Sequence, residues 1–417
     1  MKGRKTSPLL VAFVTVAIDL LGFGIVLPLL PLYAEHLLGG IPTAYHGLTI
    51  GLVMASFSFM QFLFMPGWGR LSDRIGRRPV LIIGLSGSVV FYALFGLASV
   101  QKSLVLLFIS RIGAGIAGAT IGTAQAVIAD STPPERRAKG MALIGMAFGV
   151  GFTLGPIIGS LWADKHGTEL SPLPGFVASG LSLAALVLAV VRLPETRPVG
   201  VELPRRPWFN VEGWALALGN RGVAVPLLTF FVATLAFASF EGTLARFAKD
   251  ELRFSLREMC YLFAYVGFVL MLTQGLIVRR LVTKVGEVAM TIMGTLLMLA
   301  GLVVVALFMS PDSLVFILAT LALTVIGFAF LTPSVQALIS RRSSALRQGE
   351  VLGVNQAAAA VARILGPVLG NVLYGSAASP DHGRPYYAGA GLLAVALALA
   401  LTLRPDKADV PRPAPAG

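Results

Sequence analysis

The sequence has few of the side chains with which enzymes and metal proteins do their chemistry. It contains one cysteine, Cys260, which excludes an intramolecular disulfide, and only four histidines in 417 residues. It has no spacing typical of a metal site, no phosphate-binding loop of the P-loop type, and no nucleophile beside a base. We therefore expect no enzyme activity, no metal, no cofactor and no direct use of ATP.

Charge is also scarce, because 13% of residues are charged whereas 56% are hydrophobic, and the mean hydropathy is +0.82. Apolar runs of 18 or more residues are typical of membrane-spanning helices. The runs cover roughly residues 8–33, 46–66, 79–100, 103–128, 140–163, 173–193, 222–244, 257–278, 288–309, 313–338, 351–376 and 386–403. They predict an all-α integral membrane protein with twelve transmembrane helices. The first run is too long for a signal peptide, so we expect it to remain as a span.

The positive charges are distributed unevenly among the links between these runs. With twelve spans both termini lie on one side, and cytoplasmic termini would place 24 of the 33 Lys and Arg residues inside and 7 outside. This asymmetry predicts a multi-pass protein of the cell inner (plasma) membrane with both termini cytoplasmic. It also explains the net charge of +13 as a topology signal, so we expect no nucleic-acid partner.

The sequence consists of two similar halves. GPIIG at 155–159 recurs as GPVLG at 366–370, an offset of 211, and Gly76 aligns with Gly286 at an offset of 210. Two independent matches at nearly one offset indicate a duplicated six-helix unit. The predicted parts are an N-terminal six-helix bundle at 1–193, a cytoplasmic linker at 194–221, a C-terminal six-helix bundle at 222–404 and a disordered cytoplasmic tail at 405–417.

A dense charge cluster follows the second apolar run, where GWGRLSDRIGRR at 67–78 holds four arginines and an aspartate. Residues 69–78 match the loop signature G-x-L-x-D-R-x-G-R-R of the major facilitator superfamily at every defined position. The chain resembles the twelve-span drug–proton antiporter branch of that family, which includes multidrug and tetracycline efflux proteins. Supporting stretches are DLLGFGIVLPLLPLYA (19–34), RIGAGIAGA (111–119), IADSTPPERRAKG (128–140) and GFTLGPIIGS (151–160). The resemblance implies the major facilitator fold of two pseudo-symmetric six-helix bundles.

This resemblance implies that the 67–78 cluster belongs to a cytoplasmic gate. Asp73 is the one acid among the arginines, and we expect it to cap a helix of the other bundle while pairing with Arg74 or Arg136. Placement of positive charge on the cytoplasmic side is the alternative explanation for the arginines. Thr283 replaces the aspartate in the second half, which suggests that the halves gate unequally. The expected gate residues are Gly69, Asp73, Arg74, Gly76, Arg77, Asp130 and Arg136.

Four charges fall within the predicted spans: Asp19, Arg111, Glu241 and Arg363. A charge in the hydrocarbon layer costs at least about 2.5 kcal/mol, so such residues usually face a cavity or an ion path. Asp19 lies about 16 Å into the first span by helical rise, where it is a proton or substrate site or a hydrogen-bonded packing residue. Arg111 resembles the family's arginine of proton coupling, and packing is again the alternative.

Glu241 and Arg363 leave more readings open. Glu241 is a proton or substrate site or an interfacial acid at the outer mouth, and Phe237, Phe240 and Phe247 around it form an apolar wall or plain packing. Arg363 neutralises Asp19 or Glu241, or binds an anionic substrate group. These alternatives cannot be separated from the sequence.

The fifth span carries the stretch that resembles the antiporter motif, with Ser160 in place of the motif's final glycine. Its residues Gly151, Gly155, Pro156 and Gly159 predict close helix packing and a kink, which are compatible with gating. The uncharged polar residues Gln125, Gln336 and Asn355 are secondary candidates for a cavity lining.

Together these features predict a secondary active transporter that exports small lipophilic, and in some cases cationic, compounds in exchange for protons. The expected partners are a small-molecule substrate, protons and the lipid bilayer, and we expect a monomer. The alternatives are a proton-coupled importer or exporter of a small metabolite, such as a sugar or organic anion, and a non-transporting membrane receptor.

Overall fold

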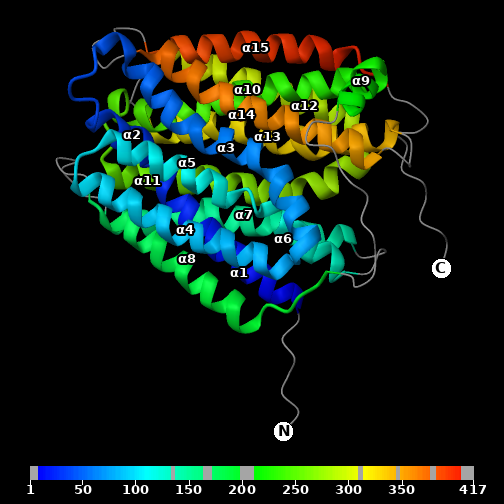
Figure 1. The fold of residues 1–417 in the computed structure, drawn as a ribbon. Helices are drawn as coiled ribbons and strands as arrows, with labels where there is room; N and C mark the ends of the chain where they lie inside the picture. The colour runs from blue at the N-terminus through cyan, green and yellow to red at the C-terminus, as the bar shows by residue number, and fades with distance from the viewer. Residues whose placement is uncertain are drawn as a thin grey trace. The chain divides into compact units, whose positions relative to one another are not determined.

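The computed structural model describes residues 8–132, 137–162, 171–197, 211–308, 313–343, 348–375 and 382–404. In all of these ranges the regular secondary structure is helical (Figure 1). Eleven helical segments are long and apolar enough to cross a membrane, and Met146–Ser160 is a shorter apolar helix at the place of the predicted fifth span. The prediction of an all-α membrane protein with twelve transmembrane helices is confirmed.

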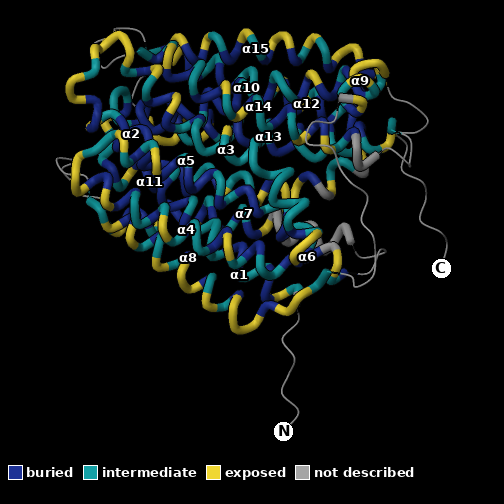
Figure 2. Tube along the Cα trace, in the orientation of Figure 1, coloured by how far each residue is buried: buried dark blue, intermediate teal, exposed yellow. Residues whose placement is uncertain are grey.

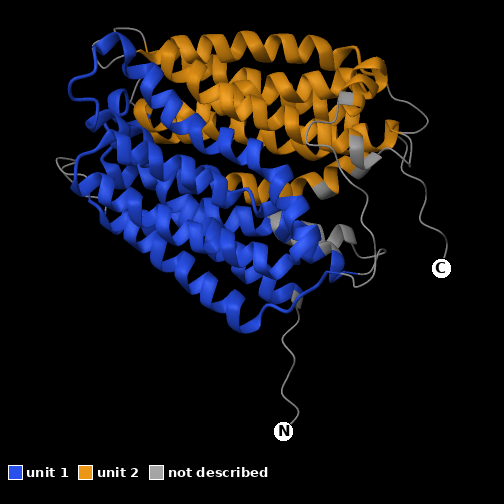
Figure 3. Ribbon diagram, in the orientation of Figure 1, with its two compact units in different colours: residues 1–208, 248–268 blue, residues 209–247, 269–417 orange. Residues whose placement is uncertain are grey.

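The chain forms two compact units, residues 1–208 with 248–268 and residues 209–247 with 269–417 (Figure 3). Unit 1 contains α1 (Pro8–Val26), α2 (Leu30–His36), η1 (Thr43–Tyr45), α3 (His46–Ile75), α4 (Arg77–Val100), α5 (Leu104–Gly118), α6 (Ile121–Asp130), α7 (Arg137–Ser160) and α8 (Leu173–Arg192). Unit 2 contains α9 (Val211–Gly219), the π-helical turn η3 (Thr273–Val278), α12 (Arg279–Leu307), α13 (Leu314–Arg342), α14 (Gln348–Tyr374) and α15 (Arg384–Leu401). Helices α10 (Arg221–Asp250) and α11 (Leu256–Leu272) contribute to both.

Two contacts attach residues 248–268 to the rest of unit 1. Lys249 Nζ lies 2.8 Å from Glu35 Oε2 at the end of α2. Gly267 on α11 packs so closely on α7 that a Cβ there would lie 2.5 Å from the carbonyl oxygen of Phe152. A polar tie and a close backbone approach therefore hold this segment within unit 1.

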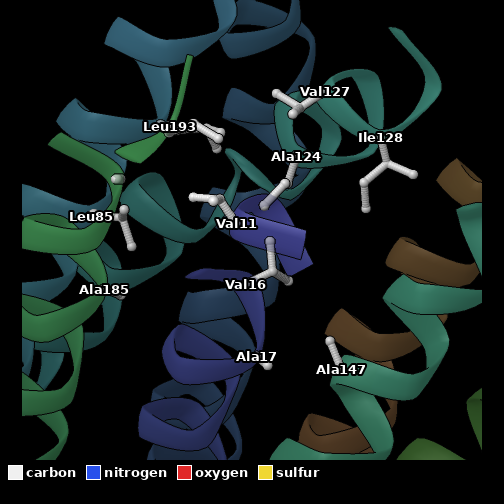
Figure 4. Close-up of a cluster of buried hydrophobic side chains, with 13 residues drawn as sticks. Val11, Val16, Ala17, Leu85, Ala124, Val127, Ile128, Ala147, Ala185 and Leu193 are labelled. Atoms are coloured by element: carbon white, nitrogen blue, oxygen red, sulfur yellow. The ribbon is translucent and has the colours of Figure 1, made fainter. Parts of the chain in front are cut away.

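The core of unit 1 is built around α1. Figure 4 shows Val11, Val16 and Ala17 of α1 within a cluster of small and branched side chains from its neighbours. That cluster also includes Leu85, Ala124, Val127, Ile128, Ala147, Ala185 and Leu193. The many alanines allow close approach of the helices, as is typical of packing in membranes, where small residues bring backbones together.

Large apolar side chains remain on the outer faces of the helices. Val315 is 78% exposed, Val105 68% and Leu161 66%, and Figure 2 shows exposed positions along helices such as α8 and α15. A soluble protein rarely exposes so many large apolar side chains. In a membrane, contact with lipid acyl chains removes these apolar faces from water.

The helix boundaries correct two details of the sequence prediction. Residues 67–78 are not a loop, because α3 continues through Ile75, α4 begins at Arg77, and Gly76 alone breaks the helix. The predicted seventh span ended at residue 244, whereas α10 continues to Asp250 and includes Arg246, which is 1% exposed. Arg246 is therefore a buried charged residue within a helical span, in addition to the four charges that the sequence placed within spans.

Candidate functional site

The junction between α3 and α4 depends on Gly76. Its φ of 108° and ψ of 159° combine a positive φ with extended ψ, a conformation that side-chain-bearing residues avoid. A Cβ at Gly76 would also lie 2.3 Å from Glu195 Oε2. Gly69 differs, because it lies within α3 and a Cβ there would meet no atom of the described residues within 4 Å. The structure therefore gives a reason for the glycine at 76 and none at 69.

Arg77 is the centre of a charge cluster that we call the Arg77 cluster: Ser72, Asp73, Arg77 and Asp130. Its Nη1 contacts Asp73 Oδ1 and donates to Ser72 Oγ at 2.7 Å, while Nε lies 3.3 Å from Oδ2 of Asp130 at the end of α6. The Arg77 side chain is only 9% exposed. The predicted pairing of Asp73 with Arg74 is wrong, since its partner is Arg77, and Arg136 lies outside the described residues.

Glu195, which follows α8, was missed by the sequence analysis. Its carboxylate accepts hydrogen bonds from the backbone N–H groups of Arg77 at 2.9 Å and Arg78 at 3.2 Å, so it caps the N-terminus of α4. The N–H groups of Thr196 and Arg197 donate to the same carboxylate. Although partial burial acts in the opposite direction, these hydrogen bonds hold the pKa of Glu195 below its ordinary value. Glu195 thus anchors the chain after α8 to the start of α4.

Asp19 lies on the face of α1 that packs against α4 and α8. Ser182 Oγ of α8 donates to Asp19 Oδ1 at 3.2 Å, and the Ser88 hydroxyl of α4 lies close to the same carboxylate. Gly22, one turn along α1, faces the Tyr92 ring on α4. The acid is therefore held between two hydroxyl groups inside unit 1.

Arg111 on α5 is 2% exposed and lies beside the same region. Its guanidinium carbon is 5.1 Å from the centre of the Phe95 ring and 5.7 Å from that of Tyr92. Arg111 Nη2 has no hydrogen-bond partner among the described residues. Asp19 and Arg111 form no direct ion pair, and the Tyr92 ring lies near both Gly22 of α1 and the Arg111 guanidinium.

We call this group the Asp19 cluster: Asp19, Ser88, Tyr92, Arg111 and Ser182. Its two charged members were predicted from the sequence, whereas its three neutral members were not. Ser88 and Tyr92 are four residues apart on α4, so they share one helix face. That spacing was the available signal for them.

In unit 2, Glu241 of α10 and Arg363 of α14 interact electrostatically without a direct ion pair between them. Glu241 is half-buried, and Arg363 is exposed although it lies mid-helix. The structure thus favours Glu241 as the neighbour of Arg363. The three phenylalanines pack within unit 2: Phe237 stacks on Phe328 with ring centres 3.9 Å apart, while Phe240 and Phe247 lie edge-on to Tyr386.

Arg246 shows how unit 2 accommodates a buried cation near the end of α10. Its Nη2 donates to the carbonyl oxygen of Gly375 at 2.8 Å, and Nη1 lies 3.4 Å from Asn371 Oδ1. The guanidinium also lies over the Tyr374 ring, 4.4 Å from its centre. Arg246 therefore caps the C-terminal end of α14, where a cation is favourable.

The fifth-span motif brings α7 against α1. A Cβ at Gly151 would lie 2.6 Å from the carbonyl oxygen of Leu20, and one at Gly155 would lie 2.6 Å from the carbonyl carbon of Gly24. Gly159 is less tight, with 3.3 Å to the nearest atom, and Pro156 lies inside the helix. The second copy of the motif repeats this packing, since Gly366 on α14 lies against Ala238 on α10.

The three uncharged candidates differ in their surroundings. Gln125 on α6 and Gln336 on α13 are half-buried. Asn355 on α14 is fully buried, and neither polar atom of its side chain has a hydrogen-bond partner among the described residues. Because buried amides are normally satisfied, Asn355 is the best of the three candidates for a polar cavity.

Comparison with known proteins agrees with this arrangement. A model of the Major Facilitator Superfamily matches residues 12–367 and 275–417. The chain belongs to this superfamily. Among its relatives, the class C tetracycline resistance protein of Escherichia coli is 32% identical over 399 residues, covering 94% of this chain and 96% of that protein. Multidrug resistance protein 1 of Bacillus subtilis (strain 168) is 28% identical and covers 95% of this chain and 96% of that protein.

A solved structure extends the comparison to the fold. The crystal structure of the human organic anion transporter MFSD10 (TETRAN) superposes on this superfamily member with a TM-score of 0.68 and 26% identity. It covers 96% of this chain and 100% of that chain. The predicted membership of a superfamily of transporters, with efflux proteins among the relatives, is confirmed.

Proposed function

We propose that this superfamily member exports small lipophilic compounds in exchange for protons by alternating access. The names of its relatives, a tetracycline and a multidrug resistance protein, support this function. The observation that carries the proton coupling is the Asp19 cluster, in which a half-buried acid on α1 accepts a hydrogen bond from α8 and the buried Arg111 lies over the Tyr92 ring. An ionisable group at that depth is costly unless it has a function.

In this proposal Asp19 takes up and releases the proton. The Ser88 and Ser182 hydroxyls hold its carboxylate, and either hydroxyl adapts to a charged or a neutral acid because it can donate or accept. Arg111 supplies a fixed positive charge, which favours release of the proton from Asp19. Protonation then decides which facing state is favoured, since each state stabilises one form of the acid.

The Arg77 cluster is the proposed cytoplasmic gate, and both termini lie in the cytoplasm. The uneven distribution of Lys and Arg supports this orientation. A gate that opens in each cycle needs contacts of modest strength, and a partly hydrated ion pair contributes about 1–3 kcal/mol at most. Asp73 and Asp130 are 29% and 19% exposed, which fits such a contact.

A second candidate function is the transport of a small organic anion. Arg363 favours it, because a mid-helix arginine with an exposed side chain is suited to bind a carboxylate or phosphate group. The name of the solved relative, an organic anion transporter, points in the same direction. Glu241, which interacts with Arg363, favours cationic compounds instead. Substitution of each residue in turn therefore distinguishes drug export from anion transport.

The experiment is uptake into proteoliposomes, with an imposed pH gradient, of matched cationic, neutral and anionic compounds. Drug export predicts gradient-dependent transport of cationic and neutral lipophilic compounds, and Glu241→Gln should weaken transport of the cations only. Anion transport predicts that Arg363→Gln abolishes uptake of the anions while Glu241→Gln spares it. Transport that ignores the pH gradient for every compound would overturn proton coupling.

A further inference from the structure

The second half of the chain contains a charge-inverted counterpart of the ion pair between Arg77 and Asp130. Arg77 corresponds to Glu287 at the offset of 210, and Asp130 corresponds to Arg341 at the offset of 211. In unit 2 Arg341 Nη2 lies 2.9 Å from Glu287 Oε1, and Nη1 lies 3.5 Å from Oε2. The repeat has therefore preserved an ion pair while exchanging its charges.

The backbone around the two pairs is equivalent. Gly286 has φ 81° and ψ 165°, which repeats the break at Gly76 with φ 108° and ψ 159°. Each glycine is followed by the first residue of a new helical segment, Arg77 in unit 1 and Glu287 in unit 2. Each partner lies at the end of another helix, because Asp130 is the last residue of α6 and Arg341 lies in the last turn of α13.

Reversing the charges reverses their relation to the helix dipoles. A helix N-terminus favours an anion and a C-terminus favours a cation. Glu287 and Arg341 are each at the favourable end, so both helix termini stabilise the pair. Arg77 at an N-terminus and Asp130 at a C-terminus are each at the unfavourable end.

The immediate surroundings differ in the same sense. Glu287 is 5% exposed and meets both terminal nitrogens of Arg341, and two-point pairing of this kind is strong and directional. Arg77 instead divides its donors among three acceptors, Asp73, Asp130 and Ser72. In unit 1 the carboxylate of Glu195 occupies the α4 N-terminus and offsets the misplaced cation there.

We propose that Glu287 and Arg341 form a permanent strut that keeps the ends of α12 and α13 together throughout the transport cycle. The pair Arg77–Asp130 is by contrast the one that opens. The second half thus keeps its contact closed while the first half opens its own. The inverted charges suit the duplicated contact to each of these roles. This inference rests on the proposed alternating-access function.

The test links each pair covalently. In a Cys260→Ser background, Glu287→Cys with Arg341→Cys and, separately, Arg77→Cys with Asp130→Cys are treated with a short bifunctional methanethiosulfonate, and transport is compared before linking, after linking and after reduction. The strut predicts that the second-half link retains at least about half of the unlinked rate, because that contact need not open. The first-half link should reduce transport about tenfold or more, with recovery on reduction.

A large, reducible loss of transport on linking Glu287→Cys to Arg341→Cys would overturn the proposal. If the unlinked cysteine variant is inactive, the exchanged variant Glu287→Arg with Arg341→Glu decides the question. It retains a pair, so its melting temperature and transport should exceed those of Glu287→Arg alone, and no recovery would again contradict a strut. The melting temperatures test the ion pair without any substrate. If the wild-type protein is folded but transports none of the compounds, only the proposed function is contradicted, and the melting comparison still tests the strut.

Discussion

The two glycines of the 69–78 motif have different tasks at the scale of single residues. Gly76 has a positive φ and lies against the Glu195 carboxylate, whereas Gly69 is a helical residue with open space beside it. Gly76→Ala should destabilise the protein by about 1–2 kcal/mol through the positive φ alone, and more through the contact with Glu195.

The matched control is Gly69→Ala, which should be neutral or stabilise by up to about 1 kcal/mol, since alanine favours a helix. Apparent melting temperatures in detergent compare the two variants. Equal effects of the two substitutions would show that the junction at Gly76 does not constrain the backbone as described.

Asp73 is one of the two acids that neutralise Arg77. Asp73→Asn leaves the pair of Arg77 with Asp130 in place, so folding and membrane insertion should be close to wild type. Transport should be slower, and the population should shift away from outward-facing states, because the proposed cytoplasmic gate is weakened. Single cysteines at the periplasmic ends of helices, placed in a background lacking Cys260, would report the shift as slower labelling. Unchanged labelling together with unchanged turnover would remove Asp73 from the gate.

At the scale of helices, Glu195 couples the end of α8 to the start of α4, and this coupling depends on pH. The folded-state pKa of Glu195 lies below its ordinary value of 4.5. Its contribution to stability is therefore fully present above the unfolded pKa and is lost as pH falls through the folded pKa. Because the side chain is largely solvated, we expect Glu195→Gln to cost no more than about 1 kcal/mol near neutral pH.

The measurement is the difference in melting temperature between wild type and Glu195→Gln over a pH series. The difference should be constant near neutral pH, should shrink as the pH falls below 4.5, and should vanish once the pH lies below the folded-state pKa, where the Glu195 side chain is neutral too. A difference that persists unchanged in acid would mean that the charge of Glu195 does not contribute to the cap.

The approach of α7 to α1 is the closest helix contact described for the motif region. Gly155→Ala would place a Cβ against the backbone of Gly24, which cannot move aside like a flexible side chain. The helices would have to separate, at a cost of about 1–3 kcal/mol. Gly180→Ala on α8 is the control, because a Cβ there meets no atom within 4 Å in the part of the chain that the structure describes. If both variants melt alike, the close approach does not contribute to stability.

Hydropathy and the repeat offset predicted the helices and the recurrence of the fifth-span motif in the second half, because both depend on residue type and spacing along the chain. The end of α10 was misjudged because the predicted span ended just before Arg246 and its charged neighbours, whereas Arg246 is buried by contacts with α14. The partners of Arg77 combine a local contact, Asp73 one helical turn away, with a distant one, Asp130. The local pairing was missed because 67–78 was read as a loop, and the distant pairing depends on the tertiary fold.

For the whole molecule, we propose that protonation and deprotonation of Asp19 drive transport. The direct test is substrate-evoked proton flux in proteoliposomes that contain wild-type or Asp19→Asn protein, with downhill substrate exchange measured in the same vesicles. Asparagine has nearly the same shape and can still accept the Ser182 hydrogen bond, so the fold and downhill exchange should be retained. If Asp19 carries the coupled proton, Asp19→Asn should abolish the proton flux. Full substrate-evoked flux in the folded variant would contradict it.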